Sequence, residues 1–187
     1  MVFSLISKLI NGIKGGVVGG LKGVADIGSS VVGVVKNLTV TTLKETKEFV
    51  VSGIEVPASI VKGAFSGVAE IGESVIRAVK GIVQGTVQGV IESGGNQKQA
   101  VSGSVTQAVH SAKEMGLDIG ETAVEAVKGS VEAIKQVGGD TIEATKEAIT
   151  SALDAAQEIG SEATDSVKEA LVAGVEGAKD IMEEIKK

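Results

Sequence analysis

The chain contains no cysteine and a single proline, and aromatic residues make up only 2% of its 187 residues. Without cysteine it can form neither disulfide bonds nor thiolate metal sites. Tryptophan and tyrosine are also absent, so a core cannot take its buried area from large aromatic rings. The hydrophobic residues, 43% of the chain, are mostly valine, isoleucine and alanine. This composition predicts a wide and shallow apolar surface.

Residues suited to catalysis or metal binding are equally scarce. His110 is the only histidine, and with no cysteine or second histidine to join it, neither a metal site nor a catalytic triad is predicted. Glu143, Lys146 and Glu147 stand at the charge-pairing intervals typical of a solvated helix face. The glycine-rich stretch at 15–20 follows no strand and does not fit a dinucleotide-binding loop. We expect a protein that is not an enzyme, with no catalytic residue, metal, cofactor or small-molecule substrate.

Charge is distributed unevenly along the chain. The first 100 residues hold ten Lys/Arg and seven Asp/Glu, whereas residues 101–187 hold eight and seventeen. Lys8, Lys14 and Lys22 all precede the first acidic residue, Asp26. A basic N-terminal part and an acidic C-terminal part indicate that the first part binds membranes and the second keeps the protein soluble. The alternative is that these are the ordinary charges of solvated helices. No basic cluster or set of stacking aromatics is present, so nucleic acid is not an expected partner.

No segment has the length and apolarity of a membrane-spanning helix. Charged residues interrupt every apolar run, and a spanning helix needs roughly 20 mostly apolar residues. The first residues also lack the basic region and cleavage site of a signal peptide. We expect a cytoplasmic protein that is peripheral at a membrane or lipid surface.

Apolar residues recur with a period of eleven. One run passes through Val131, Ile142, Leu153, Thr164 and Val175, and similar runs occur earlier in the chain. Eleven residues in three turns is about 3.67 residues per turn, close to the 3.6 of a straight α-helix, so the apolar stripe runs nearly parallel to the helix axis. The sequence therefore predicts an all-α fold of long amphipathic helices, extended or hairpin-like rather than compact and globular. The sustained alternation typical of strands is absent.

Few residues interrupt this pattern. Thr42–Glu45 has the form of a capping box, Pro57 ends or kinks whatever precedes it, and Ser93–Asn96 is the best candidate loop, with Asn96 as the N-cap. Gly138–Asp140 resembles a helix break followed by a cap, but the eleven-residue register passes through it unchanged, so a continuous helix is predicted there. The predicted helices are 2–36, 42–54, 57–93 and 97–186. The corresponding regions are a basic Gly/Val-rich N-terminal helix (1–36), a break and short helix (37–57), a Gly/Val-rich helix (58–93), a loop (94–97) and a long acidic helix (98–187).

Small residues form a second strip, separate from the apolar face. Gly81, Gly85 and Gly89 stand at four-residue spacing, and such strips allow two helix backbones to approach closely. The alternative is that the small residues have no packing role and merely occupy the non-apolar side of the helix. The predicted helix–helix packing positions are Gly12, Gly16, Gly20, Gly63, Gly81, Gly85, Gly89, Ala148, Ala152 and Ala156.

The first 24 residues form the most amphipathic segment. Their apolar side chains share one face, and two lysines, Lys8 and Lys22, lie opposite, which is the layout of a helix in a membrane interface. The alternative is a helix packed on the rest of the protein. The predicted lipid contacts are Val2, Phe3, Ile6, Leu9, Ile10, Ile13, Val17, Leu21 and Val24, with Lys8 and Lys22 facing headgroups.

Three stretches carry a resemblance to known proteins: "VKGIVQGTVQGV" (79–90), "AVKGSVEAIKQVGGDTIEATKEAI" (126–149) and "LKETKEFVVSG" (43–53). They resemble the eleven-residue repeats of perilipins, synucleins and group 3 late embryogenesis abundant proteins. The resemblance is one of repeat class and covers most of the chain after residue 42. It implies coating of lipid droplets or vesicles by an in-plane helix, or protection of membranes during desiccation, by chains that are often disordered until they meet a surface. This chain has more glycine and isoleucine, and its second half is strongly acidic.

Three functions are compatible with these features. The first is a peripheral coat for a lipid or other apolar surface, made through a shallow Val/Ile face. The second is a self-assembling structural protein, a homo-oligomer that forms a helical wall, tube or filament through small-residue packing. The third is a soluble stress protectant. They differ in whether helix forms with lipid, with concentration or with drying.

Overall fold

The computed structural model describes residues 2–45 and 53–187, with side chains from Ile6 onward. Over these residues the chain is all-α, as the sequence predicts, and no strand is present in them. The helices are α1 (Val2–Leu21), α2 (Ile27–Glu45), α3 (Glu55–Glu70), α4 (Val75–Glu92), α5 (Gln97–Met115), α6 (Ile119–Gln136), α7 (Thr141–Ile159), α8 (Ser161–Gly174) and α9 (Ala178–Ile185).

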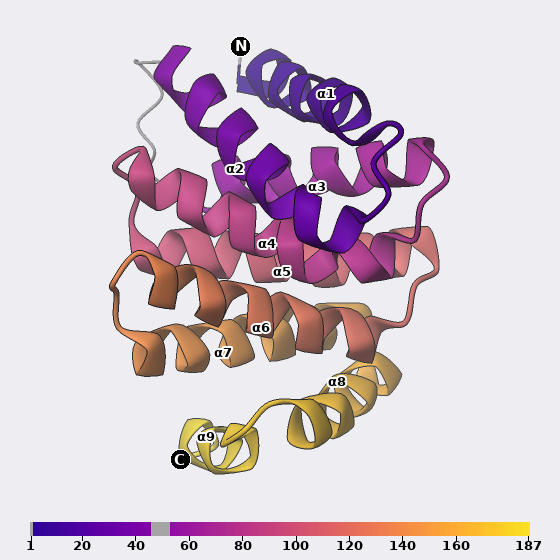
Figure 1. The fold of residues 1–187 in the computed structure, drawn as a ribbon. Helices are drawn as coiled ribbons and strands as arrows, with labels where there is room; N and C mark the ends of the chain where they lie inside the picture. Colours follow the sequence, from indigo (N-terminus) through magenta and orange to yellow (C-terminus); the bar gives the residue numbers. More distant parts are fainter. Residues whose placement is uncertain (1, 46–52) are drawn as a thin grey trace.

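The helices stack in two layers, running from α1 and α2 at one end to α8 and α9 at the other (Figure 1). Apart from α2 and α3, helices that follow one another in sequence pack together, and through α8 each helix packs most extensively against the helix two places away. The odd-numbered helices therefore form one layer and the even-numbered helices form the other. This is the arrangement of an α-solenoid, in which each unit contacts only nearby units. The helix packing is compact, unlike the extended or hairpin-like arrangement that the sequence predicts.

Glycines with positive φ make the turns between helices. Gly72, Gly94, Gly116, Gly138 and Gly160 all have positive φ, and each stands 22 residues after the one before. A residue with a side chain is strained at positive φ, so glycine is favoured there. Four of these turns also share a hydrogen bond that closes a Schellman motif: Glu73 N to Val68 O, Gly95 N to Val90 O, Leu117 N to Ala112 O and Gly139 N to Ile134 O. The structural unit is thus one helix and one turn.

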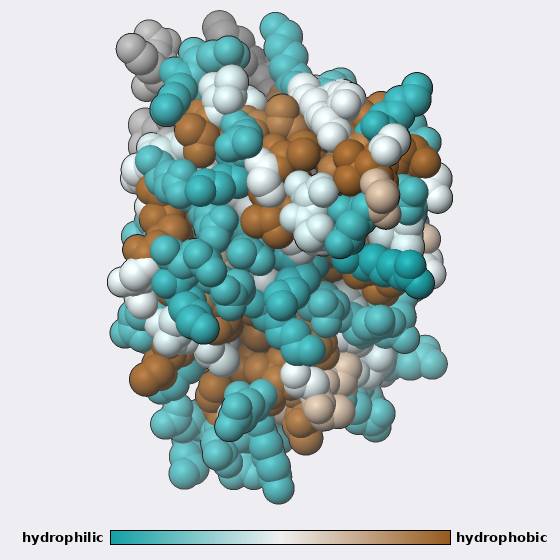
Figure 2. All heavy atoms as spheres, viewed as in Figure 1, coloured by the Kyte–Doolittle hydropathy of each residue, from teal (hydrophilic) through white to brown (hydrophobic). Residues whose placement is uncertain are grey.

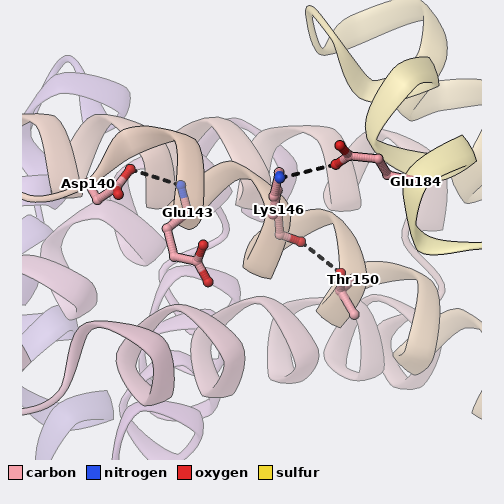
Figure 3. Close-up of polar contacts among 5 residues, drawn as sticks. All are labelled: Asp140, Glu143, Lys146, Thr150 and Glu184. Carbon is pink, nitrogen blue, oxygen red and sulfur yellow. Dashed lines mark hydrogen bonds and ion pairs between the residues drawn. The ribbon is translucent and has the colours of Figure 1, made fainter.

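The continuous helix predicted through Gly138 is wrong. Helix α6 ends at Gln136 and α7 begins at Thr141. The Asp140 side chain caps α7 by accepting hydrogen bonds from the backbone N–H groups of Ile142 and Glu143, each at 3.0 Å; Figure 3 shows the bond from Glu143. Such a cap contributes about 1 kcal/mol. The prediction failed because a 22-residue unit is two eleven-residue periods. The apolar register therefore crosses each turn unchanged.

Three other boundaries differ from the prediction. The helix predicted over 2–36 is broken at Gly23, where φ is +81°, and the helix predicted over 57–93 is broken at Gly72. The long helix predicted over 97–186 is likewise divided into α5 to α9. The loop before α5 is confirmed. Asn96 is the N-cap of α5, and its side chain accepts a hydrogen bond from Gln99 N at 3.1 Å.

The break predicted near residues 37–42 is also wrong, because α2 continues to Glu45. Val35, Thr39 and Leu43 are buried at four-residue spacing, so the helix keeps one face in the core. The Thr39 hydroxyl donates to the Val35 carbonyl at 2.7 Å, which satisfies its polar group inside the helix. Residues 46–52 of the short helix predicted over 42–54 lie outside the described residues.

Candidate functional site

The predicted lipid-contact stripe of α1 faces the interior of the protein. Ile13, Val17 and Leu21 are at most 1% exposed. Ile13 and Val17 pack against α3, as the neighbours of its glycines show. The remaining described members are half-buried and the two lysines are exposed: Ile6, Leu9, Ile10 and Val24, then Lys8 and Lys22. The side chains of Val2 and Phe3 lie outside the described residues. In the closed stack this stripe is therefore already covered, except near its first turns.

The predicted glycine strip of α4 lies directly against α2. A methyl group added at Gly85 would stand 2.6 Å from the Val32 carbonyl oxygen and 3.0 Å from the Lys36 nitrogen. One added at Gly89 would stand 2.6 Å from the Thr39 Cβ, and Gly81 meets α2 in the same way. These distances are too short for a side chain, so glycine is what lets the two backbones touch.

The same contact recurs between α3 and α1. A methyl group at the predicted Gly63 would lie 2.5 Å from the Ile10 carbonyl oxygen, and one at Gly67, which the sequence did not single out, would lie 2.9 Å from that of Lys14. Of the other predicted positions, Gly16 and Gly20 lie against α2 side chains, whereas no described atom lies within 4 Å of a methyl group at Gly12. The three predicted alanines of α7 are fully buried: Ala148, Ala152 and Ala156.

Besides Gly67, sequence reasoning missed three further glycines of this kind, one of them Gly120, whose added methyl group would lie 3.0 Å from the Ser166 carbonyl oxygen of α8. Gly103 meets the Ile54 carbonyl and Gly129 meets the Lys80 carbonyl, again between helices two places apart. The 22-residue step would have found both, since Gly103 follows Gly81 by one step and Gly129 follows Gly85 by two. The eleven-residue period alone does not distinguish them from other glycines.

Ion pairs join helices of the same layer along the rims of the stack. The Lys146 ammonium lies 3.0 Å from the Glu184 carboxylate, linking α7 to α9 (Figure 3). His110 lies 3.0 Å from Glu158, and this contact is an ion pair only when the imidazole is protonated. Exposed pairs contribute about 0.2–1 kcal/mol each, so they support the helix register without determining it. The other pairs of this kind are Lys14–Glu70, Lys36–Glu92 and Lys62–Glu114.

One carboxylate has a displaced pKa. Glu147 lines a cleft of about 250 Å³ between α5 and α7. Burial raises the pKa of Glu147 above its ordinary value of 4.5, and the nearby Lys98 opposes that shift while Glu143 and Asp154 add to it. The folded state therefore holds this proton more tightly than the unfolded chain does.

Replacing Glu147 with glutamine is expected to make thermal stability less dependent on pH. For a raised pKa, the favourable contribution is present below the ordinary value and is lost as pH rises through the folded-state pKa. Glu147→Gln should therefore melt at a higher temperature than the parent at neutral pH, and the difference should vanish in acid. Circular dichroism melts measure it. Glu132→Gln is the matched control, since it removes a surface carboxylate but keeps an oxygen that can accept from Gln136. Equal gains in both variants at neutral pH would contradict the assignment.

The surface is mostly hydrophilic, with apolar side chains reaching it in patches toward both ends of the stack (Figure 2). At the far end a cleft of about 330 Å³ lies between α7, α8 and α9, and its wall includes Lys168, Val172 and Ile185. Across the described ranges, no group of three or more His, Asp or Glu side chains is placed to hold a metal ion. No helix among them is both long enough and apolar enough to cross a bilayer.

No family model matches this chain, and no curated protein matches it.

Proposed function

We propose that the protein is a non-enzymatic coat for a lipid or other apolar surface, and that its helical stack opens at the glycine turns to bind. The observation that carries this proposal is the 22-residue spacing of Gly72, Gly94, Gly116, Gly138 and Gly160, which is twice the apolar period. The extended helix expected from the sequence would be the surface-bound form. The closed stack would be the form present without a surface.

Because the turns are spaced by two apolar periods, the same side chains can form the apolar face in both the closed and the opened form. Ile134, Ala156 and Val167 are fully buried in α6, α7 and α8, and they are separated by 22 and 11 residues. If the turns between them became helical, these side chains would line one continuous face. The side chains that fill the closed core are thus the ones that an opened chain would present to a surface.

We expect only a small free-energy difference between the closed stack and the surface-bound form. A buried valine or isoleucine gains about 1.5–3 kcal/mol whether its new neighbours are protein or acyl chains. Opening loses the glycine contacts between backbones, and the surface supplies apolar contact in their place. At the basic end, α1 has no acidic residue, and each lysine near an anionic lipid surface adds about 1 kcal/mol. This makes α1 the first segment expected to engage.

Flotation with anionic vesicles tests the proposal. Ile6→Asp combined with Leu9→Asp places two charges on the half-buried part of the α1 stripe, and binding is expected to fall by more than about tenfold. Ser7→Asp with Asn11→Asp is the matched control, because it adds the same charge at exposed positions of the same helix. Circular dichroism verifies that both variants keep their helix. Unchanged flotation of the first variant, or no flotation of the parent protein, would refute the proposal.

A further inference from the structure

The first and last helices of a solenoid each lack one neighbour in their layer. Terminal units of such proteins normally present a polar outer face. Among the described residues, no helix packs on the side of α1 away from α3, and none packs on the side of α8 away from α6. What these two helices turn outward therefore decides whether the ends are closed.

Helix α1 turns an empty glycine strip outward. No described atom lies within 4 Å of a methyl group built at Gly12, Gly15 or Gly19. Gly19 precedes Gly63 by 44 residues, and Gly85 by 66, both multiples of the 22-residue unit. Those two glycines each receive a backbone carbonyl of the preceding helix in their layer. Gly19 thus occupies the position where a preceding helix docks, and no helix of the described ranges is there.

Helix α8 presents the complementary part of this contact. Lys36, Lys80 and Val124 each meet glycines of the next helix in the even layer. Lys168 stands in the same register, 44 residues after Val124, and no helix of that layer follows it. One turn further, the Val172 side chain is 50% exposed. These two residues line the cleft that α8 forms with α7 and α9, so the positions that elsewhere pack into a glycine strip remain accessible here at the edge of that cleft.

The two open ends also carry opposite charge. Helix α1 and the turn after it present Lys8 and Lys22, both exposed, and no acidic residue precedes Asp26. On α8 the exposed charged residues are acidic: Glu162, Asp165 and Glu169. Opposite potentials steer such surfaces together and set their orientation.

We propose that the α8 face of one copy docks on the glycine strip of α1 in a second copy, continuing the solenoid from chain to chain. The contact is head-to-tail, so it does not close and builds an open string of molecules. A second copy fits better than a bilayer here, because a glycine strip offers little apolar area but accommodates a helix backbone. This inference does not depend on the coat function.

Sedimentation velocity without lipid tests the contact, using charge reversal at each end. One variant carries Lys8→Glu and Lys22→Glu, so both of its ends are acidic. The other carries Asp165→Lys and Glu169→Lys, so both of its ends are basic. The parent is expected to associate as concentration rises, and less so at high salt. Each variant alone should stay monomeric, and an equal mixture should associate again. Lys113→Glu with Lys135→Glu, on exposed positions in the middle of the stack, is the control and should associate like the parent.

The glycine strip is tested by Gly19→Leu. Because no described atom lies within 4 Å of a methyl group at Gly19, the variant should keep the parent's helix content by circular dichroism and lose association by more than about tenfold. A monomeric parent, a mixture of the two charge variants that stays monomeric, or a Gly19→Leu protein that associates like the parent would overturn the inference. Vesicle flotation is scored separately, so a chain that floats but never associates overturns this contact and leaves the coat function standing.

Discussion

Replacing Gly85 with alanine is expected to destabilise the protein by about 2–3 kcal/mol, although alanine is the better helix former. The new methyl group would meet the Val32 carbonyl oxygen and the Lys36 nitrogen of α2. Both are backbone atoms inside a helix, so neither can rotate away as the end of a side chain could. Helices α2 and α4 would have to separate, and the valines packed between them would lose contact.

Urea unfolding followed by circular dichroism measures this loss. Gly33→Ala is the matched control, because Gly33 lies within α2 and no described atom would lie within 4 Å of the added methyl group. That variant should be more stable than the parent by about 0.5–1 kcal/mol, the ordinary gain of alanine over glycine in a helix. If the two variants shift stability in the same direction, the close approach of α2 and α4 is not present in solution.

Tying α1 to α2 with a disulfide is expected to abolish vesicle binding, with a drop of more than about tenfold. A Cβ built at Gly20 lies 3.7 Å from the Cβ of Val34, within the roughly 3.5–4.5 Å range of natural disulfides. The double variant Gly20→Cys with Val34→Cys has no competing thiol, since the chain lacks cysteine. The bridge would keep the turn at Gly23 closed, so α1 could not straighten away from α2.

The same protein supplies its own control. After reduction, flotation should return to the level of the parent. The oxidised form should also be more stable to urea, by about 3 kcal/mol for a loop of this length. Oxidised protein that floats as well as reduced protein, with the bridge verified by mass, would show that binding needs no opening of the α1–α2 turn. The coat proposal would then have to rest on the closed stack.

The sequence predicted the helical class and the apolar period, but not the turns. Gly138 shows why: its turn falls where two whole periods end, so the pattern of apolar residues contains no interruption there. The turn is marked only by local chemistry, a left-handed glycine followed by the cap of Asp140. Periodicity outweighed that local chemistry in the prediction. Conversely, the capping-box pattern of Thr42–Glu45 suggested that a helix begins there, whereas burial of Val35, Thr39 and Leu43 keeps α2 continuous.

The candidate surfaces were predictable to a similar degree. Four-residue spacing identified Gly81, Gly85 and Gly89, because close backbone approach requires small residues at that interval. It could not identify α2 as the neighbouring helix, since that depends on the layer order. For α1, amphipathicity places Ile13 and Val17 on one face but does not specify what covers it. Either a membrane or a neighbouring helix could cover the same apolar stripe.

The equal spacing of the glycine turns also governs how the length of this chain can change. Inserting or deleting one 22-residue unit would exchange the layers of every later helix while keeping its stripe and its turns in register. Inserting eleven residues would preserve the stripe but lengthen one helix by half a unit, so the turn after it would no longer lie beside the other turns. Because stability in such stacks is roughly a sum over units and their contacts, whole units could be duplicated or lost with proportionate effects. Length is therefore free to vary in steps, and longer or shorter versions of this chain would still fold by the same rules.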